Sequence, residues 1–151
     1  MNNMKIANFL SADDVVPEFA ASDKQKLLLE LSRRAGAKLG ISADRIFAEL
    51  NKREQLGSTG MGDGVAIPHA RYHEINKPFG MFVHLKKPIA FDAVDGKPVD
   101  IVFLLLLPDA SAGEQLGALA SIARKLRDST KAAALRSARD GAVIYQALTA
   151  E

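Results

Sequence analysis

Residues 99–107 decide the fold, and they read VDIVFLLLL, from Val99 to Leu107. All but Asp100 are apolar, without the alternation of polar and apolar side chains that marks a strand with one solvated face. The run is far shorter than the roughly 20 apolar residues that a membrane-spanning helix needs. We therefore predict a central β-strand that other elements cover on both faces.

Two further strands are predicted upstream of this run. Residues 79–85 alternate at the period of a strand. Residues 65–69 form a shorter candidate that ends at Pro68, so His69 should lie at a strand end. Turns are expected at Lys87-Pro88 and at residues 95–98, which read Asp-Gly-Lys-Pro. The middle of the chain is thus expected to supply the sheet.

Helices are predicted before this middle segment. Ser22 and Gln25 have the spacing of a capping box, and apolar residues follow at helical spacing until Gly36 or Gly40, either of which can end the helix. A second helix is expected to begin after Ser42. Both are expected to be structural.

Three more helices are predicted in the last third of the chain: one with Glu114 in its first turn, one capped by Ser129 and one capped by Asp140. Helices, then strands, then helices around a doubly buried strand predict an α/β fold. Since the strand connections are short, we expect a three-layer α/β/α sandwich around a mixed central β-sheet. The chain has 151 residues without repeats or a low-complexity linker, so a single domain over residues 1–151 is expected.

The composition excludes several classes of chemistry. The chain has no cysteine, which excludes a disulfide framework, thiolate metal sites and thiol catalysis. Its net charge of +2 is too small to predict nucleic-acid binding. Because the first nine residues hold no apolar run of signal-peptide length, a cytoplasmic protein without membrane insertion is expected.

The segment 57–64, GSTGMGDG, contains four of the eleven glycines and is expected to be a loop. It lacks the lysine of a Walker A loop and does not form a dinucleotide fingerprint between a strand and a helix, so no nucleotide cofactor is expected. Two interpretations stay open. The loop is either an anion cradle of backbone N–H groups with the hydroxyls of Ser58 and Thr59, or a tight connection between helix and strand.

His69 is the leading candidate for chemistry among the three histidines of the chain. A neutral imidazole beside the glycine-rich loop can act as a nucleophile, a general base or a ligand. His73 follows at a spacing that would suit metal binding on a helix, but no helix start is evident and no third ligand is near, so no metal is expected. His84 alternates with strand residues and is expected to be structural.

A basic stretch follows in residues 124–139. A solvated helical face is the simpler interpretation of these lysines and arginines. The alternative is a docking surface for an acidic partner.

The region from Leu50 to Ala70 carries a longer pattern, LNKRE and then GSTGMGDGVAIPHA. This pattern closely resembles the EIIA domain of the fructose/mannitol type (PTS EIIA type 2) in the bacterial phosphoenolpyruvate:sugar phosphotransferase system. The resemblance covers nearly the whole chain. A stand-alone domain of this length is most similar to the nitrogen-regulatory branch of the family, EIIA-Ntr.

The resemblance implies a phosphocarrier that needs no cofactor. His69 would accept a phosphoryl group from the phosphohistidine of an HPr-like protein (NPr), which Enzyme I-Ntr charges. Arg53 would clamp the phosphoryl oxygens, and Ser58, Thr59 and the loop amides would complete the anion site. The residues agree with this chemistry, because phosphoryl transfer depends mainly on positioning and on cationic and N–H donors.

One position departs from the family pattern. The family commonly has a second active-site histidine after the apolar strand, in an E-H-L context, where this chain has Glu114-Gln115-Leu116. Gln115 can donate a hydrogen bond to a phosphoryl oxygen but cannot titrate. We expect phosphorylation of His69 to survive this change, which favours regulation over sugar uptake.

Two functions therefore stand side by side. The first is a regulatory phosphocarrier whose two states bind different proteins; the family's targets include potassium-transport components and sensor kinases. The alternative is a non-catalytic protein-interaction module that keeps the EIIA fold, with Gln115 marking the lost chemistry.

Overall fold

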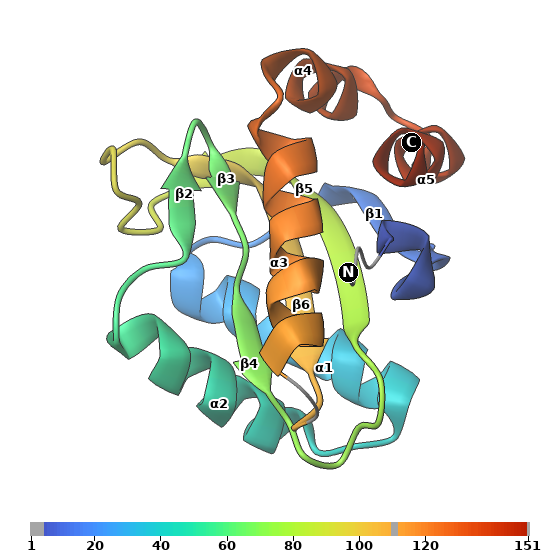
Figure 1. Cartoon of the computed structure of the whole chain (residues 1–151). Helices are drawn as coiled ribbons and strands as arrows, with labels where there is room; N and C mark the ends of the chain where they lie inside the picture. Colours follow the sequence, from blue (N-terminus) through green and yellow to red (C-terminus); the bar gives the residue numbers. More distant parts are fainter. Residues whose placement is uncertain (1–4, 110–111, 151) are drawn as a thin grey trace.

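A computed structural model describes residues 5–109 and 112–150 of the chain (Figure 1). In these residues six strands form one mixed sheet, in the order β1-β5-β6-β3-β2, and β4 also pairs with β6. The strands are β1 (Leu10–Phe19), β2 (Gly60–Gly62), β3 (Val65–Ala66), β4 (His69–Arg71), β5 (Phe79–Ile89) and β6 (Val99–Leu107). β6 lies at the centre of the sheet, antiparallel to β5 and parallel to β3 and β4. This central position is the one predicted for the strand that is buried on both faces.

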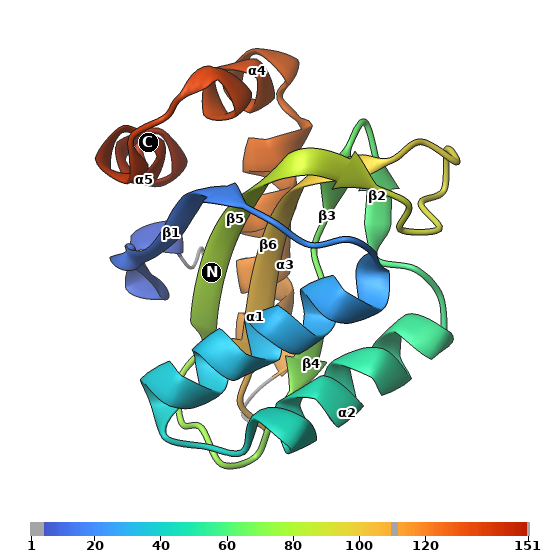
Figure 2. The same cartoon turned by 180° about the vertical axis from the view of Figure 1, so that it is seen from behind.

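Helices cover both faces of this sheet, as Figures 1 and 2 show from opposite sides. The helices of one face are α1 (Lys24–Leu39) and α2 (Ala43–Gln55). Those of the other face are α3 (Ala112–Arg127), α4 (Ser129–Ser137) and α5 (Gly141–Thr149), with a short 3-10 helix at Ile6–Asn8. The predicted three-layer α/β/α sandwich around a mixed sheet is confirmed. No helix of the described ranges is long and apolar enough to cross a bilayer.

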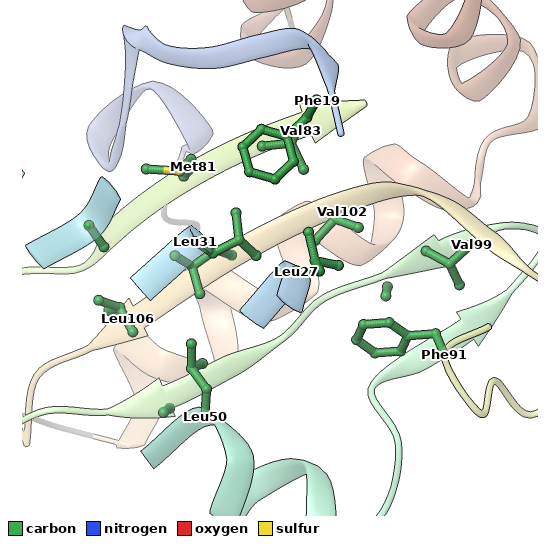
Figure 3. Close-up of a cluster of buried hydrophobic side chains, with 14 of the residues drawn as sticks. Phe19, Leu27, Leu31, Leu50, Met81, Val83, Phe91, Val99, Val102 and Leu106 are labelled. Atoms are coloured by element: carbon green, nitrogen blue, oxygen red, sulfur yellow. The ribbon is translucent and has the colours of Figure 1, made fainter. Parts of the chain in front are cut away.

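The apolar run of β6 holds the layers together because its alternate side chains enter two different cores. The core against α1 and α2 receives Val102, Leu104 and Leu106. The core against α3, α4 and α5 receives Ile101, Phe103, Leu105 and Leu107. Figure 3 shows the first of these cores, in which Leu27 and Leu31 of α1 and Leu50 of α2 lie among side chains of β5 and β6.

The structure corrects two of the predicted helix caps. Asp23, rather than Ser22, caps α1, because its carboxylate accepts a hydrogen bond from the Lys26 amide. Asp128, rather than Ser129, caps α4 in the same way. Gly40 ends α1 in the left-handed conformation at φ 71°, which glycine adopts at no steric cost.

Predicted caps at Ser42 and Asp140 are confirmed, since their side chains accept from the amides of Arg45 and Ala142.

The strands differ from the prediction in four places. Residues 60–62, within the segment predicted to be a loop, form β2, which pairs with β3. Pro88 lies within β5 instead of forming a turn, and a register shift against β6 accompanies it. The candidate over residues 65–69 is two strands, because β3 ends at Ala66 and β4 begins at His69, and both pair with β6 in one register on either side of Pro68. His69 therefore does lie at a strand end, as predicted. The edge strand β1 was not predicted, since its acidic residues and Pro17 break the alternation; an edge strand tolerates proline.

Candidate functional site

His69 is the first residue of β4 and lies opposite Leu105 of β6. Pro68 has no amide hydrogen, but its carbonyl accepts a hydrogen bond from the Leu105 amide at 3.0 Å, so the chain stays attached to the central strand. The side chain of His69 is half-buried. The histidine is therefore fixed to the rigid middle of the sheet and reaches the surface.

The imidazole ring is oriented by its own backbone. Nδ1 of His69 lies 2.8 Å from the carbonyl oxygen of Ile67. Because a carbonyl can only accept a hydrogen bond, Nδ1 carries the proton in this arrangement. The lone pair of a neutral ring is then on Nε2.

The surroundings of His69 favour that neutral ring. Burial lowers the pKa of the His69 imidazole below its ordinary value, and the nearby positive charge of Arg53 lowers it further. The hydrogen bond to Ile67 and the negative charge of Glu54 raise this pKa but do not cancel the effect of burial. At neutral pH the ring can therefore act as a nucleophile.

A cleft of about 590 Å³ opens in front of His69. Its polar lining brings together Lys52 and Arg53 from the end of α2 with Arg71 from β4, and Glu49 is its acidic residue among the described ones. The rest of its lining is apolar and consists of Leu56, Ala70, Leu107, Leu116 and Leu119. The site is thus a cationic pocket with an apolar rim, suited to an anionic group carried by a larger molecule.

Arg53 and His69, the two residues predicted to carry the chemistry, line this same cleft. Nη1 of Arg53 donates a hydrogen bond to the Gly57 carbonyl at 2.8 Å, which ties the guanidinium to the start of the glycine-rich loop. A guanidinium has five N–H donors, so others are left for an anion.

Ser58 and Thr59 are close in sequence to the cleft but do not line it. The Ser58 hydroxyl donates to the Phe91 carbonyl at 2.7 Å, and the Thr59 hydroxyl donates to the buried carboxylate of Glu54. A direct bond from either hydroxyl to a phosphate would require these bonds to break. Their phosphate-binding role stays a prediction, and the contacts favour support of the loop.

Gln115 lies in the first turn of α3, and its side chain is outside the part that the structure describes. The following residue, Leu116, lines the cleft with 67% of its surface exposed. The start of α3 therefore faces the site, while the role predicted for the Gln115 amide stays a prediction.

The other two histidines are placed elsewhere. His73 follows β4, and since residues 69–71 form a strand, the helical spacing that a metal pair would need is absent there. It lines a neighbouring hollow with Arg45 and Tyr72, which shares Glu49 and Arg71 with the cleft. His84 is half-buried in β5, with Nε2 3.5 Å from the Asp100 carboxylate. Among the residues whose side chains the structure describes, no cluster of three or more potential metal ligands occurs.

The basic stretch in residues 124–139 is only partly a solvated face. Arg136 contacts the Asp100 carboxylate through Nε at 3.0 Å and donates through Nη2 to the Asp63 carbonyl at 2.7 Å. Arg124, Arg127 and Lys131 are exposed.

Sequence reasoning missed two of the cationic residues of the cleft, Lys52 and Arg71. The strand period could have identified Arg71, because residues two apart in β4 point to the same face as His69. Lys52 precedes Arg53 in a helix, and only the packing of α2 against β4 shows that both lie at the cleft.

Comparisons with known proteins relate the chain to one family. The family described as phosphoenolpyruvate-dependent sugar phosphotransferase system, EIIA 2, matches residues 8–151. A nitrogen regulatory protein of Bradyrhizobium diazoefficiens is 41% identical over 145 residues, which cover 96% of this chain and 95% of that protein.

Solved structures agree with this relation. Nitrogen regulatory protein IIA-Ntr of Neisseria meningitidis has a TM-score of 0.91 and 33% identity, covering 95% of this chain and 99% of its own. The mannitol IIA protein of Escherichia coli, with a TM-score of 0.75 and 17% identity, covers 91% of this chain and 97% of its own and shares the fold.

Proposed function

Because the chain belongs to the EIIA type 2 family of the phosphoenolpyruvate-dependent sugar phosphotransferase system, we propose that it is a regulatory phosphocarrier. His69 accepts a phosphoryl group from an HPr-like phosphocarrier (NPr), which Enzyme I-Ntr charges from phosphoenolpyruvate. The phosphorylated and unphosphorylated states then bind different partner proteins.

The observation that carries this proposal is the bond between His69 and Ile67. With the proton on Nδ1, the lone pair of Nε2 attacks phosphorus as the P–N bond to the donor imidazole breaks, and the donor, whose other ring nitrogen is protonated, takes the electrons of that bond and leaves as a neutral ring. The His69 ring gains positive charge, and the Ile67 carbonyl stabilises it by accepting from Nδ1. No proton has to leave during the step.

The cationic side chains supply the electrostatic part of the mechanism. Negative charge on the phosphoryl oxygens is balanced by Arg53, which is already held by Gly57, and by Lys52 and Arg71 in the same cleft. Ser58 and Thr59 support the loop, and Gln115 is the proposed amide donor from α3.

The apolar rim supports a protein as the donor. Leu56 is 84% exposed and Leu116 is 67% exposed, and both border the cleft. Large apolar side chains exposed around a charged pocket are typical of a surface that another protein covers. Phosphorylation adds up to about −2 charges amid these cations, which is enough to change which partner surface is attracted.

The experiment is phosphorylation with phosphoenolpyruvate, an Enzyme I and an HPr-type carrier. We expect the wild-type chain to gain one acid-labile phosphoryl group, His69→Ala to gain none and the matched control His73→Ala to gain one. If the wild type gains none, the phosphocarrier proposal is wrong and the alternative of a non-catalytic interaction module holds. If His69→Ala gains as much as the wild type, the phosphoryl group is not on His69 and the proposal is wrong as well.

Partner choice is tested separately. Wild type, His69→Ala and phosphorylated wild type are used as baits against potassium-transport components and sensor kinases, the classes of target that the family resemblance suggests. A regulatory phosphocarrier binds at least one of them differently in its two states, and equal binding by all three baits contradicts regulation by phosphorylation.

A further inference from the structure

A carboxylate lies buried behind the site. Glu54 directly follows Arg53 in α2, and its side chain is 3% exposed. Nζ of Lys24, at the start of α1, is 3.0 Å from Oε1 of Glu54. The amide of Thr59 donates to the same Oε1 at 3.0 Å, and the Thr59 hydroxyl donates to Oε2. Three donors from two different segments therefore meet on one buried acid.

The contacts continue from this acid to the reacting ring. The Thr59 carbonyl accepts a hydrogen bond from the Ile67 amide at 3.2 Å. The Ile67 carbonyl in turn lies 2.8 Å from Nδ1 of His69. Glu54 is thus connected to the imidazole by an unbroken series of hydrogen bonds through Thr59 and Ile67.

The same cluster also fixes the glycine-rich loop. Lys24 contacts the Phe91 carbonyl at 3.4 Å and lies over the Phe91 ring, and Ser58 donates to that carbonyl at 2.7 Å. Arg53, one residue before Glu54, donates to Gly57 at the start of the loop. The end of α2 therefore holds the loop directly through Arg53 and Glu54, and Lys24 of α1 contacts Glu54 and Phe91, which are partners of the loop.

A buried carboxylate is costly to desolvate, and an apolar residue could fill the same volume more cheaply. What an apolar residue could not do is receive both the amide and the hydroxyl of Thr59. The function of Glu54 is therefore to fix the position of Thr59.

We propose that Glu54 is a positioning residue for phosphoryl acceptance: through Thr59 and Ile67 it sets the orientation of the His69 ring, and it does not touch the phosphoryl group. The proposal rests on the proposed function of His69. Near-attack geometry accounts for much of the rate of such a transfer, so a small rotation of the ring is costly.

The test measures single-turnover phosphorylation by a phosphorylated HPr-type carrier in Glu54→Gln and Thr59→Val. We expect the rate constant at saturating donor to fall by about tenfold or more in each, with the donor KM and the final extent of labelling unchanged. Asp100→Asn is the matched control, because it removes a carboxylate paired with Arg136 at a site outside the cleft. It should transfer at the wild-type rate even if it is less stable.

The double variant Glu54→Gln/Thr59→Val distinguishes one positioning effect that both residues share from independent effects of the two substitutions. If both residues act through one series of bonds, the double variant is no slower than the slower single variant. Multiplied losses, or a fall in labelling extent at an unchanged rate constant, would overturn the proposal, because they indicate independent effects or a loss of folded protein.

Ring NMR of His69 provides a measurement that does not require transfer. Removing the negative charge of Glu54 should lower the pKa of His69 and shift its ring signals, while Asp100→Asn leaves both unchanged. If the wild type accepts no phosphoryl group, the proposed function fails, and the ring signals still decide whether Glu54 orients His69. Unchanged ring signals in both Glu54→Gln and Thr59→Val would overturn the positioning role.

Discussion

Replacing Arg53 by lysine keeps a positive charge at the cleft but removes the planar fork of donors. In the structure the guanidinium does two things at once, since Nη1 holds the Gly57 carbonyl at 2.8 Å while the side chain lines the cleft beside His69. A lysine ammonium is a point donor on a flexible stem. It can hold the loop or face the phosphoryl group, but it does not reproduce both contacts in one fixed geometry.

The expected size of the effect follows from the bond that is lost. A hydrogen bond to a charged group contributes about 1.5–3 kcal/mol, and here the contact is needed in the transition state. Since about 1.4 kcal/mol corresponds to tenfold in rate, Arg53→Lys should slow phosphoryl acceptance roughly 10- to 150-fold.

The assay is rapid-quench labelling of the chain at saturating phosphorylated HPr-type carrier. Arg45→Lys is the matched control, because Arg45 lies in the same helix and pairs with Glu74 at 2.5 Å outside the cleft. An Arg53→Lys rate within twofold of both wild type and Arg45→Lys would refute the reasoning that the fork matters.

Four further predictions follow from the structure. Because the pKa of His69 is lower in the folded chain than in the unfolded chain, the unfolded chain binds a proton first as the pH falls. The contribution of this histidine to the free energy of unfolding is therefore complete above about pH 6.5 and declines as the pH falls towards the folded pKa. Urea titrations should find this pH dependence reduced in His69→Gln. The rate of phosphoryl acceptance should likewise hold down to about pH 6.5 and reach its midpoint below that, and a midpoint above it would contradict the lowered pKa. Gly80→Ala should destabilise the fold by about 1–3 kcal/mol in denaturant titrations, because its Cβ would come within 2.8 Å of the buried Phe103 ring. Leu56→Glu should raise the KM for the HPr-type donor without changing the unfolding midpoint, since Leu56 is 84% exposed at the rim of the cleft, and an unchanged KM would exclude this leucine from the docking surface.

The fold was largely predictable because its central element has a strong local pattern. Apart from Asp100, the run from Val99 to Leu107 has apolar side chains on both faces of the strand, which indicates that other elements cover both faces. The structure shows a hydrophobic core on each face. Gly40 and Ser42 mark helix ends through local backbone and capping chemistry. By contrast, β1 is held in place by pairing with β5, a contact between distant segments that leaves little trace in its own sequence.

The site divides in the same way. His69 could be selected from its neighbours, because Pro68 and the glycine-rich loop are next to it in sequence. The hydroxyl of Ser58 could not be placed, since its partner is the carbonyl of Phe91, thirty-three residues away along the chain. The sequence also does not indicate that Glu54 is buried, because a glutamate in the last turn of a helix is usually solvated. Only the structure shows that its side chain is buried and paired with Lys24.

The most direct test of the proposed chemistry is to identify the nitrogen that carries the phosphoryl group. Phosphorus and nitrogen NMR of the phosphorylated chain distinguishes the two ring positions of each histidine. The bond between Nδ1 and the Ile67 carbonyl predicts a phosphoryl group on Nε2 of His69. A phosphoryl group on Nδ1 of His69, or on His73 or His84, would contradict the mechanism.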